Sequence, residues 1–134
     1  MPAERERAIR ELVAEWMRRA RADLALAQMT RQKRIVPEIL AFHAQQAVEK
    51  ALKALLVRHQ VEFPNTHSIG LLLNLVQEAG VEGIQGFANA AALTRYAVST
   101  RYPGEDEPVT REEAKEASRL AVRLVSRIEE ELGK

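Results

Sequence analysis

The stretch FHAQQAVEKALKALL, residues 42–56, decides the fold. It contains no glycine or proline, and residues that favour helices (Ala, Leu, Lys and Glu) supply most of it. Its leucines and several of its alanines recur at steps of three and four, which is the spacing of one face of an α-helix. A second face carries His43, Gln46, Lys50 and Lys53. The stretch therefore predicts an amphipathic helix whose small apolar residues let another helix approach closely.

Helical periodicity continues on both sides of this stretch. Proline is favoured in a first helical turn, so the central helix is expected to run from about Pro37 to about His59. Further helices are expected over residues 9–28, 71–77 and 87–101, and after a capping box formed by Thr110 and Glu113. Five helices with short connections predict an all-α fold, an up-and-down helical bundle of four long helices plus a short one.

The composition narrows the class of protein. A length of 134 residues suits one domain, residues 1–134, with a single core. The absence of cysteine excludes disulfides and thiolate metal sites, and the three histidines lack ligand-type spacing, so no metal and no cofactor is expected. No apolar run approaches the ~20 residues of a membrane span or resembles a signal peptide. We therefore expect a cytoplasmic protein without membrane contact.

Charge is distributed unevenly, although the formal net charge is only +1. Residues 1–34 hold nine basic and five acidic residues, a net charge of +4, whereas residues 105–134 hold six and nine, a net charge of −3. Solvated helix faces explain this pattern, and a basic helix beside an acidic surface, including the last helix of the same chain, is the alternative. Asp23 falls on an apolar stripe and is expected to find a basic or amide partner on a neighbouring helix.

Four segments, in order, resemble the HEPN domain (higher eukaryotes and prokaryotes nucleotide-binding). They are EWMRRARADLALAQ at residues 15–28, AFHAQQAVEKALKALLVRHQ at 41–60, NTHSI at 65–69 and STRYPG at 99–104. The resemblance covers nearly the whole chain, from about Trp16 to the last helix. It implies a helical homodimer that binds nucleotide or RNA. It also implies a minimal nucleotidyltransferase as partner, in a toxin–antitoxin-type pair.

Many HEPN proteins are metal-independent ribonucleases that carry an arginine, four to six further residues and a histidine, often with a tyrosine two residues later. In this chain Arg95 and Tyr102 match that pattern, but Thr100 occupies the histidine position. RNA cleavage needs a group that exchanges a proton near neutral pH, and threonine does not. No catalytic residue is therefore assigned, and a binding protein is favoured over an enzyme.

The same resemblance supplies the candidate binding residues. Arginine binds phosphate bidentately and tyrosine stacks on bases, so Arg95, Arg101 and Tyr102 are the first candidates for nucleotide or phosphate contact. Second candidates are Lys50, Lys53 and His67. The structural alternatives are a helix-end role for Arg101 and Tyr102 and neutralisation of Asp23 by the lysines.

Two other functions remain open from the sequence. One is a ribonuclease toxin with a degenerate motif. The other is a ligand-free protein-interaction scaffold, whose basic and acidic ends dock a partner.

Overall fold

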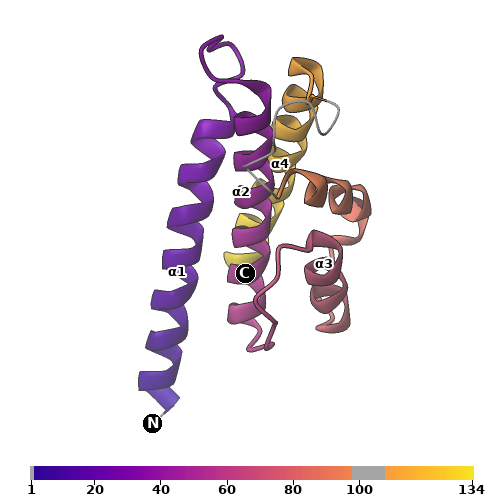
Figure 1. Cartoon of the computed structure of the whole chain (residues 1–134). Coiled ribbons are helices and arrows are strands. Elements are labelled where there is room, and N and C mark those ends of the chain that lie inside the picture. Colours follow the sequence, from indigo (N-terminus) through magenta and orange to yellow (C-terminus); the bar gives the residue numbers. More distant parts are fainter. Residues whose placement is uncertain (1, 98–107) are drawn as a thin grey trace.

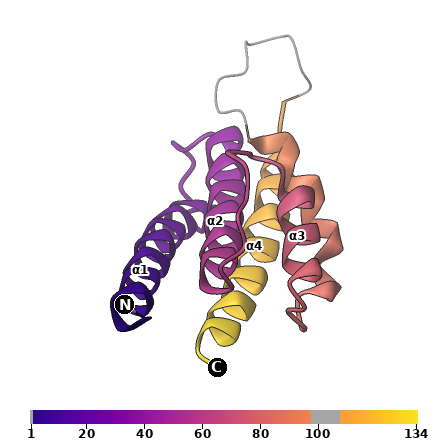
Figure 2. The ribbon, with the colours of Figure 1, turned by 90° about the horizontal axis from the view of Figure 1, so that it is seen from below.

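The computed structural model describes residues 2–97 and 108–134. Its elements, in chain order, are α1 (Pro2–Ala27), α2 (Pro37–Arg58), α3 (Ile69–Glu78), the 3₁₀-helix η1 (Gln85–Tyr96) and α4 (Arg111–Leu132). Figure 1 shows α1 and α2 side by side, with α4 behind α2 and the shorter α3 and η1 to one side. Seen from below, the order across the molecule is α1, α2, α4, then α3 with η1 (Figure 2). The predicted all-α bundle is confirmed.

The central helix of the bundle is α2. Among the described elements it alone contacts each of the other four. All six residues from Ala51 to Leu56 are buried, so neighbours enclose the helix on every side. Its burial extends to three polar side chains, Gln45, Glu49 and Lys53, which the apolar pattern alone did not place in the core.

Helix α1 begins at Pro2, seven residues earlier than the expected Ile9. The added turns are rich in Ala, Glu and Arg, which favour helices without any need for burial. Residues 2–8 are exposed, and Figure 1 shows this end of α1 extending past the rest of the bundle. The apolar periodicity therefore predicted the packed part of the helix and missed its solvated start.

The fourth expected helix differs from the prediction in type and in extent. An α-helix was expected over residues 87–101, whereas a 3₁₀-helix spans Gln85–Tyr96, and residues 98–101 lie outside the described part. Phe87 has non-helical angles (φ −109°, ψ 21°) and interrupts the element near its start. The buried residues Ala90, Leu93 and Tyr96 follow the three-residue turn of a 3₁₀-helix. That step places Tyr96 in line with Ala90 and Leu93 and buries it.

Two helix starts are fixed by capping side chains. Ser68 Oγ accepts a hydrogen bond from Leu71 N at 3.2 Å and caps α3. At α4, Thr110 Oγ1 accepts from Glu113 N at 3.0 Å, while Glu113 Oε1 accepts from Thr110 N at 3.0 Å. The predicted capping box is therefore confirmed.

Thr110→Ala should destabilise the protein by about 1 kcal/mol, because it removes the side-chain acceptor for an otherwise unpaired amide of α4. Urea unfolding followed by circular dichroism measures the change. Thr110→Ser, which keeps the hydroxyl, should restore most of the stability. Equal stability of the Ala and Ser variants would contradict the capping role.

Candidate functional site

Asp23 of α1 meets two basic side chains of α2. Its Oδ2 accepts a hydrogen bond from Lys50 Nζ at 2.6 Å, and its Oδ1 accepts from His43 Nδ1 at 2.8 Å. The residue is only 8% exposed, so the lysine and histidine satisfy a carboxylate that solvent barely reaches. The partner expected for Asp23 is confirmed, and Lys50 serves that role.

Glu49 is a second buried carboxylate, one turn from Lys53 on α2. Its Oε1 accepts hydrogen bonds from Gln45 Nε2 at 3.0 Å and from His67 Nδ1 at 2.8 Å. Its Oε2 accepts from Lys53 Nζ at 3.0 Å. Burial raises the pKa of Glu49, but the hydrogen bonds from Gln45, His67 and Lys53 outweigh it and hold the pKa below the ordinary value. The carboxylate is therefore charged and fully partnered.

Lys53 links three parts of the fold through this carboxylate. Its side chain is 5% exposed. Its ammonium group lies 5.5 Å from the ring centroid of Trp16 on α1 and 5.9 Å from that of Phe63 in the loop after α2. Such distances allow cation–π attraction in addition to the ion pair with Glu49. Lys53 is thus enclosed by protein groups and offers little surface to a ligand.

His67 lies at the edge of the same network, with its side chain 63% exposed. Because Nδ1 donates to Glu49, Nε2 is the ring nitrogen left for other contacts. The adjoining backbone joins η1, since Ile69 N donates to Thr94 Oγ1 at 3.1 Å. This bond brings the start of α3 close to the turn of η1 that carries Arg95.

Arg95 lines a groove of about 410 Å³ between η1 and α4, called the η1–α4 groove below. Its walls are Asn89, Ala92, Arg95, Tyr96, Glu113, Glu116, Ala117, Arg119, Leu120 and Arg123. The half-exposed Arg95 donates from Nη2 to Glu113 Oε2 at 3.0 Å, and its guanidinium carbon lies 4.8 Å from the Tyr96 ring centroid. Hydrogen bonds from Thr110 first, and then the positive charge of Arg95, lower the pKa of Glu113.

Two further arginines of this groove were missed in the sequence. Arg119 and Arg123 stand four residues apart on α4, and both are exposed. Within the described residues neither has a carboxylate within ion-pair distance, unlike Arg95 and Arg127. The sequence did contain a pattern that could have identified them. The residues four positions before and after Arg119 are Lys115 and Arg123, whose like charges repel that of Arg119 instead of pairing with it.

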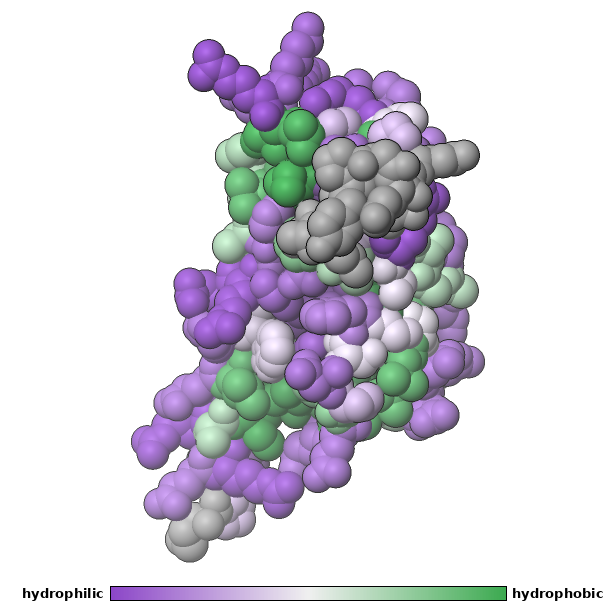
Figure 3. Space-filling view, viewed as in Figure 1, coloured by the Kyte–Doolittle hydropathy of each residue, from purple (hydrophilic) through white to green (hydrophobic). Residues whose placement is uncertain are grey.

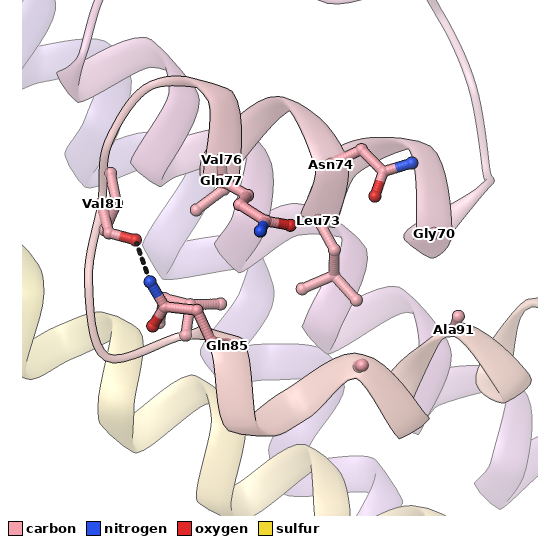
Figure 4. Close-up of a pocket in the computed structure, with 10 residues that line it drawn as sticks. Gly70, Leu73, Asn74, Val76, Gln77, Val81, Gln85 and Ala91 are labelled. Carbon is pink, nitrogen blue, oxygen red and sulfur yellow. Dashed lines mark hydrogen bonds between the residues drawn. The ribbon is translucent and has the colours of Figure 1, made fainter.

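A smaller pocket of about 170 Å³ lies between α3 and η1 (Figure 4). It is lined by apolar side chains and by the amides of Asn74, Gln77 and Gln85, without a charged group. The dashed line in Figure 4 is the hydrogen bond from Gln85 Nε2 to Val81 O, 3.4 Å long, which ties the turn before η1. The lining does not suit an anionic ligand.

The model of the HEPN domain family matches residues 13–131, almost the whole chain. The chain belongs to the HEPN family. Two solved structures resemble this HEPN domain along most of its length. One is TT1696 from Thermus thermophilus, with 35% identity and a TM-score of 0.68 over 88% of this chain and 96% of that one. A search of the curated proteins finds no match.

The other is ST0689, described as an archaeal HEPN homologue. It shares 27% identity with a TM-score of 0.70, over 89% of this chain and 96% of that one. Both solved chains are covered almost entirely, so the HEPN domain described here corresponds to nearly the whole of each.

The six candidate binding residues of this HEPN domain fall in different places. Lys53 and His67 meet at Glu49, and Lys50 lies at Asp23. Arg95 lies apart from them, in the η1–α4 groove. Residues 101 and 102, the Arg-Tyr pair before Pro103, lie outside the described residues. The two lysines are thus bound by buried carboxylates, and Arg95 is the candidate that lines a groove.

The remaining surface of the HEPN domain shows no single dominant apolar face in the view of Figure 3. That view is largely hydrophilic, with separate apolar patches. The large exposed apolar side chains of the described part are Leu12, Leu26, Met29, Val36 and Leu71. None of the helices in the described part combines the length and the apolar character that a membrane crossing needs.

Glu49→Gln should destabilise the protein by about 3–5 kcal/mol, because it leaves the buried Lys53 ammonium without a counter-charge. Urea unfolding at pH 7 gives the difference. The control is Glu15→Gln, which breaks the exposed pairs of α1 with Arg18 and Arg19 and should change stability little. Similar effects of the two variants would contradict the importance of burial at Glu49.

The same carboxylate should make stability depend on pH. The pKa of Glu49 is lower in the folded protein than its ordinary value of 4.5, so ionised Glu49 stabilises the fold above that pH. The contribution is lost as the pH falls through 4.5 toward the folded pKa. Unfolding free energies measured from neutral pH down to below the folded pKa should therefore drop more steeply for the wild type than for Glu49→Gln. Parallel curves would show that Glu49 contributes no such dependence.

Proposed function

We propose that this HEPN domain is a nucleotide- or RNA-binding module. In this proposal it acts as a homodimer beside a minimal nucleotidyltransferase, in a toxin–antitoxin-type pair. The dimer and the partner are inferred from the resemblance of this chain's motifs to those of HEPN proteins. The binding role has support of its own from the geometry around Arg95.

The observation that carries the proposal is the position of Arg95. This residue occupies the arginine position of the HEPN motif, and it lines an open groove rather than the packed core. Its carboxylate partner Glu113 is itself about one-third exposed, so a phosphate can compete for the guanidinium group at modest cost. Phosphate offers arginine a bidentate contact, whereas Glu113 is held through a single terminal nitrogen.

The chemistry at this groove favours binding over catalysis. Arginine keeps its charge at every physiological pH, so it attracts phosphate but does not transfer a proton. Thr100 stands where a proton-transferring histidine is found in many HEPN ribonucleases. Arg101 and Tyr102 belong to the same binding proposal on sequence grounds.

A ribonuclease is the second candidate function, and His67 is the observation that favours it. A buried carboxylate holds Nδ1 of this exposed histidine, which leaves Nε2 accessible for proton transfer. The nearby bond between Ile69 and Thr94 places it at the same end of the fold as η1. His67 would then supply the proton transfer that position 100 lacks.

Calorimetric titration with a short single-stranded RNA and with nucleotides tests the proposal. We expect saturable heat for the wild type and affinity about 10- to 100-fold lower for Arg95→Ala, the loss of a charge-assisted hydrogen bond. Arg18→Ala is the matched control, because Arg18 is also an exposed arginine paired with a glutamate. It should bind like the wild type.

The same samples are examined for RNA cleavage. Binding without cleavage supports the binding module. Cleavage that disappears in His67→Ala, but not in His43→Ala, would replace it with the ribonuclease. If neither RNA nor any nucleotide produces heat, the binding proposal is wrong and a protein-interaction scaffold is favoured.

A further inference from the structure

Arg119 and Arg123 form an unusual pair on the surface of α4. The other arginines of α4 have partners: Arg111 donates to two backbone carbonyls, and Arg127 is paired with two glutamates. Arg119 and Arg123 instead lie one turn apart, about 6 Å along the helix axis, without a carboxylate partner in the described part of the chain. Like charges at this spacing repel each other, so the arrangement favours an external anion.

The two arginines also lie between two hollows. They line the η1–α4 groove together with Arg95, and they line a second hollow of about 340 Å³ with Gln28 and Val122. An anion bound at Arg95 therefore has a basic path leading out of the groove and over α4. A mononucleotide would contact only one end of this basic path, whereas a strand with several phosphates would contact all of it.

The composition of the groove favours a nucleic acid over a protein partner. Protein interfaces have an apolar centre from which charged side chains are depleted. Here most of the exposed groove side chains are charged or amide groups, and the apolar ones are the small Ala92 and Ala117, the buried Tyr96 and the half-buried Leu120. Arginines beside an amide such as Asn89 suit a sugar–phosphate chain, whose phosphates supply the negative charge.

Glu116 is an acidic residue beside the basic path, and it limits where a polyanion can bind. It is exposed, lines the same groove, and has no ion-pair partner in the described residues. Its charge repels phosphate, so a bound strand should pass along the arginines rather than over this position. Removal of that charge should therefore strengthen binding of a polyanion.

We propose that Arg119 and Arg123 are phosphate contacts for a single-stranded RNA that runs from the η1–α4 groove across α4. The inference rests on the proposed binding function and makes it more specific: the ligand is a strand of several nucleotides, not a mononucleotide alone. Arg95 holds one phosphate, and the two α4 arginines hold those that follow.

The test compares binding of a fluorescent single-stranded RNA of about 12 nucleotides, by anisotropy at several salt concentrations, with binding of AMP. The double variant Arg119→Ala/Arg123→Ala should bind the RNA at least ~10-fold more weakly at low salt. Its slope of log affinity against log salt should be shallower by about 1.4, the value for two lost phosphate contacts on a single strand. Its affinity for AMP should stay close to that of the wild type.

Two control variants sharpen the comparison. Arg7→Ala/Arg10→Ala removes two exposed charges of α1, an element that does not line the groove, so it loses the same net charge and should keep the RNA affinity. Glu116→Gln should raise the RNA affinity about twofold, as expected for the loss of one exposed repulsive charge. Thermal melting of each variant confirms that the fold is retained.

The outcomes separate the inference from the proposed function. Equal RNA affinity and salt slope in the double variant and the wild type would overturn the inference and leave the binding function intact. An equal loss of AMP and RNA binding would also overturn it, because the arginines would then serve a mononucleotide site. Failure of the wild type to bind either probe would refute the proposed function, and the inference with it.

Discussion

The fold depends on one carboxylate, Glu49, in the middle of the helix that every other described element contacts. A charged group at 3% exposure is tolerated only when its partners are close and well placed. Its partners come from its own helix, through Gln45 and Lys53, and from the loop before α3, through His67. The network therefore fixes where that loop meets α2, and with it the start of α3 and the bond from α3 to η1.

This constraint also decides which basic residues remain for a ligand. The polar stripe of α2 suggested a phosphate-binding face, yet Lys50 and Lys53 are bound by Asp23 and Glu49. Moving either lysine to a ligand would leave a nearly buried carboxylate without its counter-charge, which is strongly unfavourable. The accessible basic side chains of a nucleotide site are therefore better sought on η1 and α4, where Arg95 lines an open groove.

Periodicity and capping predicted most of the helices, because the apolar stripes and the Thr110 capping box are local in the sequence. They failed at η1, where a three-residue turn buries Tyr96; the choice between 3.0 and 3.6 residues per turn depends on packing against the neighbouring α3 and α2. The position of Asp23 on the apolar stripe of its helix was enough to predict that it needs a basic or amide partner. The burial of Lys53 was not, because it depends on Trp16 and Phe63, which the chain brings together only on folding.

Phosphate binding and proton transfer call for different side chains. Arginine binds phosphate through its fixed positive charge, and this needs neither a histidine at position 100 nor a particular pH. A histidine accelerates RNA cleavage only when the RNA is already held in a reactive geometry. The binding that we propose for the η1–α4 groove therefore does not require a proton-transfer group at position 100, where this chain has Thr100.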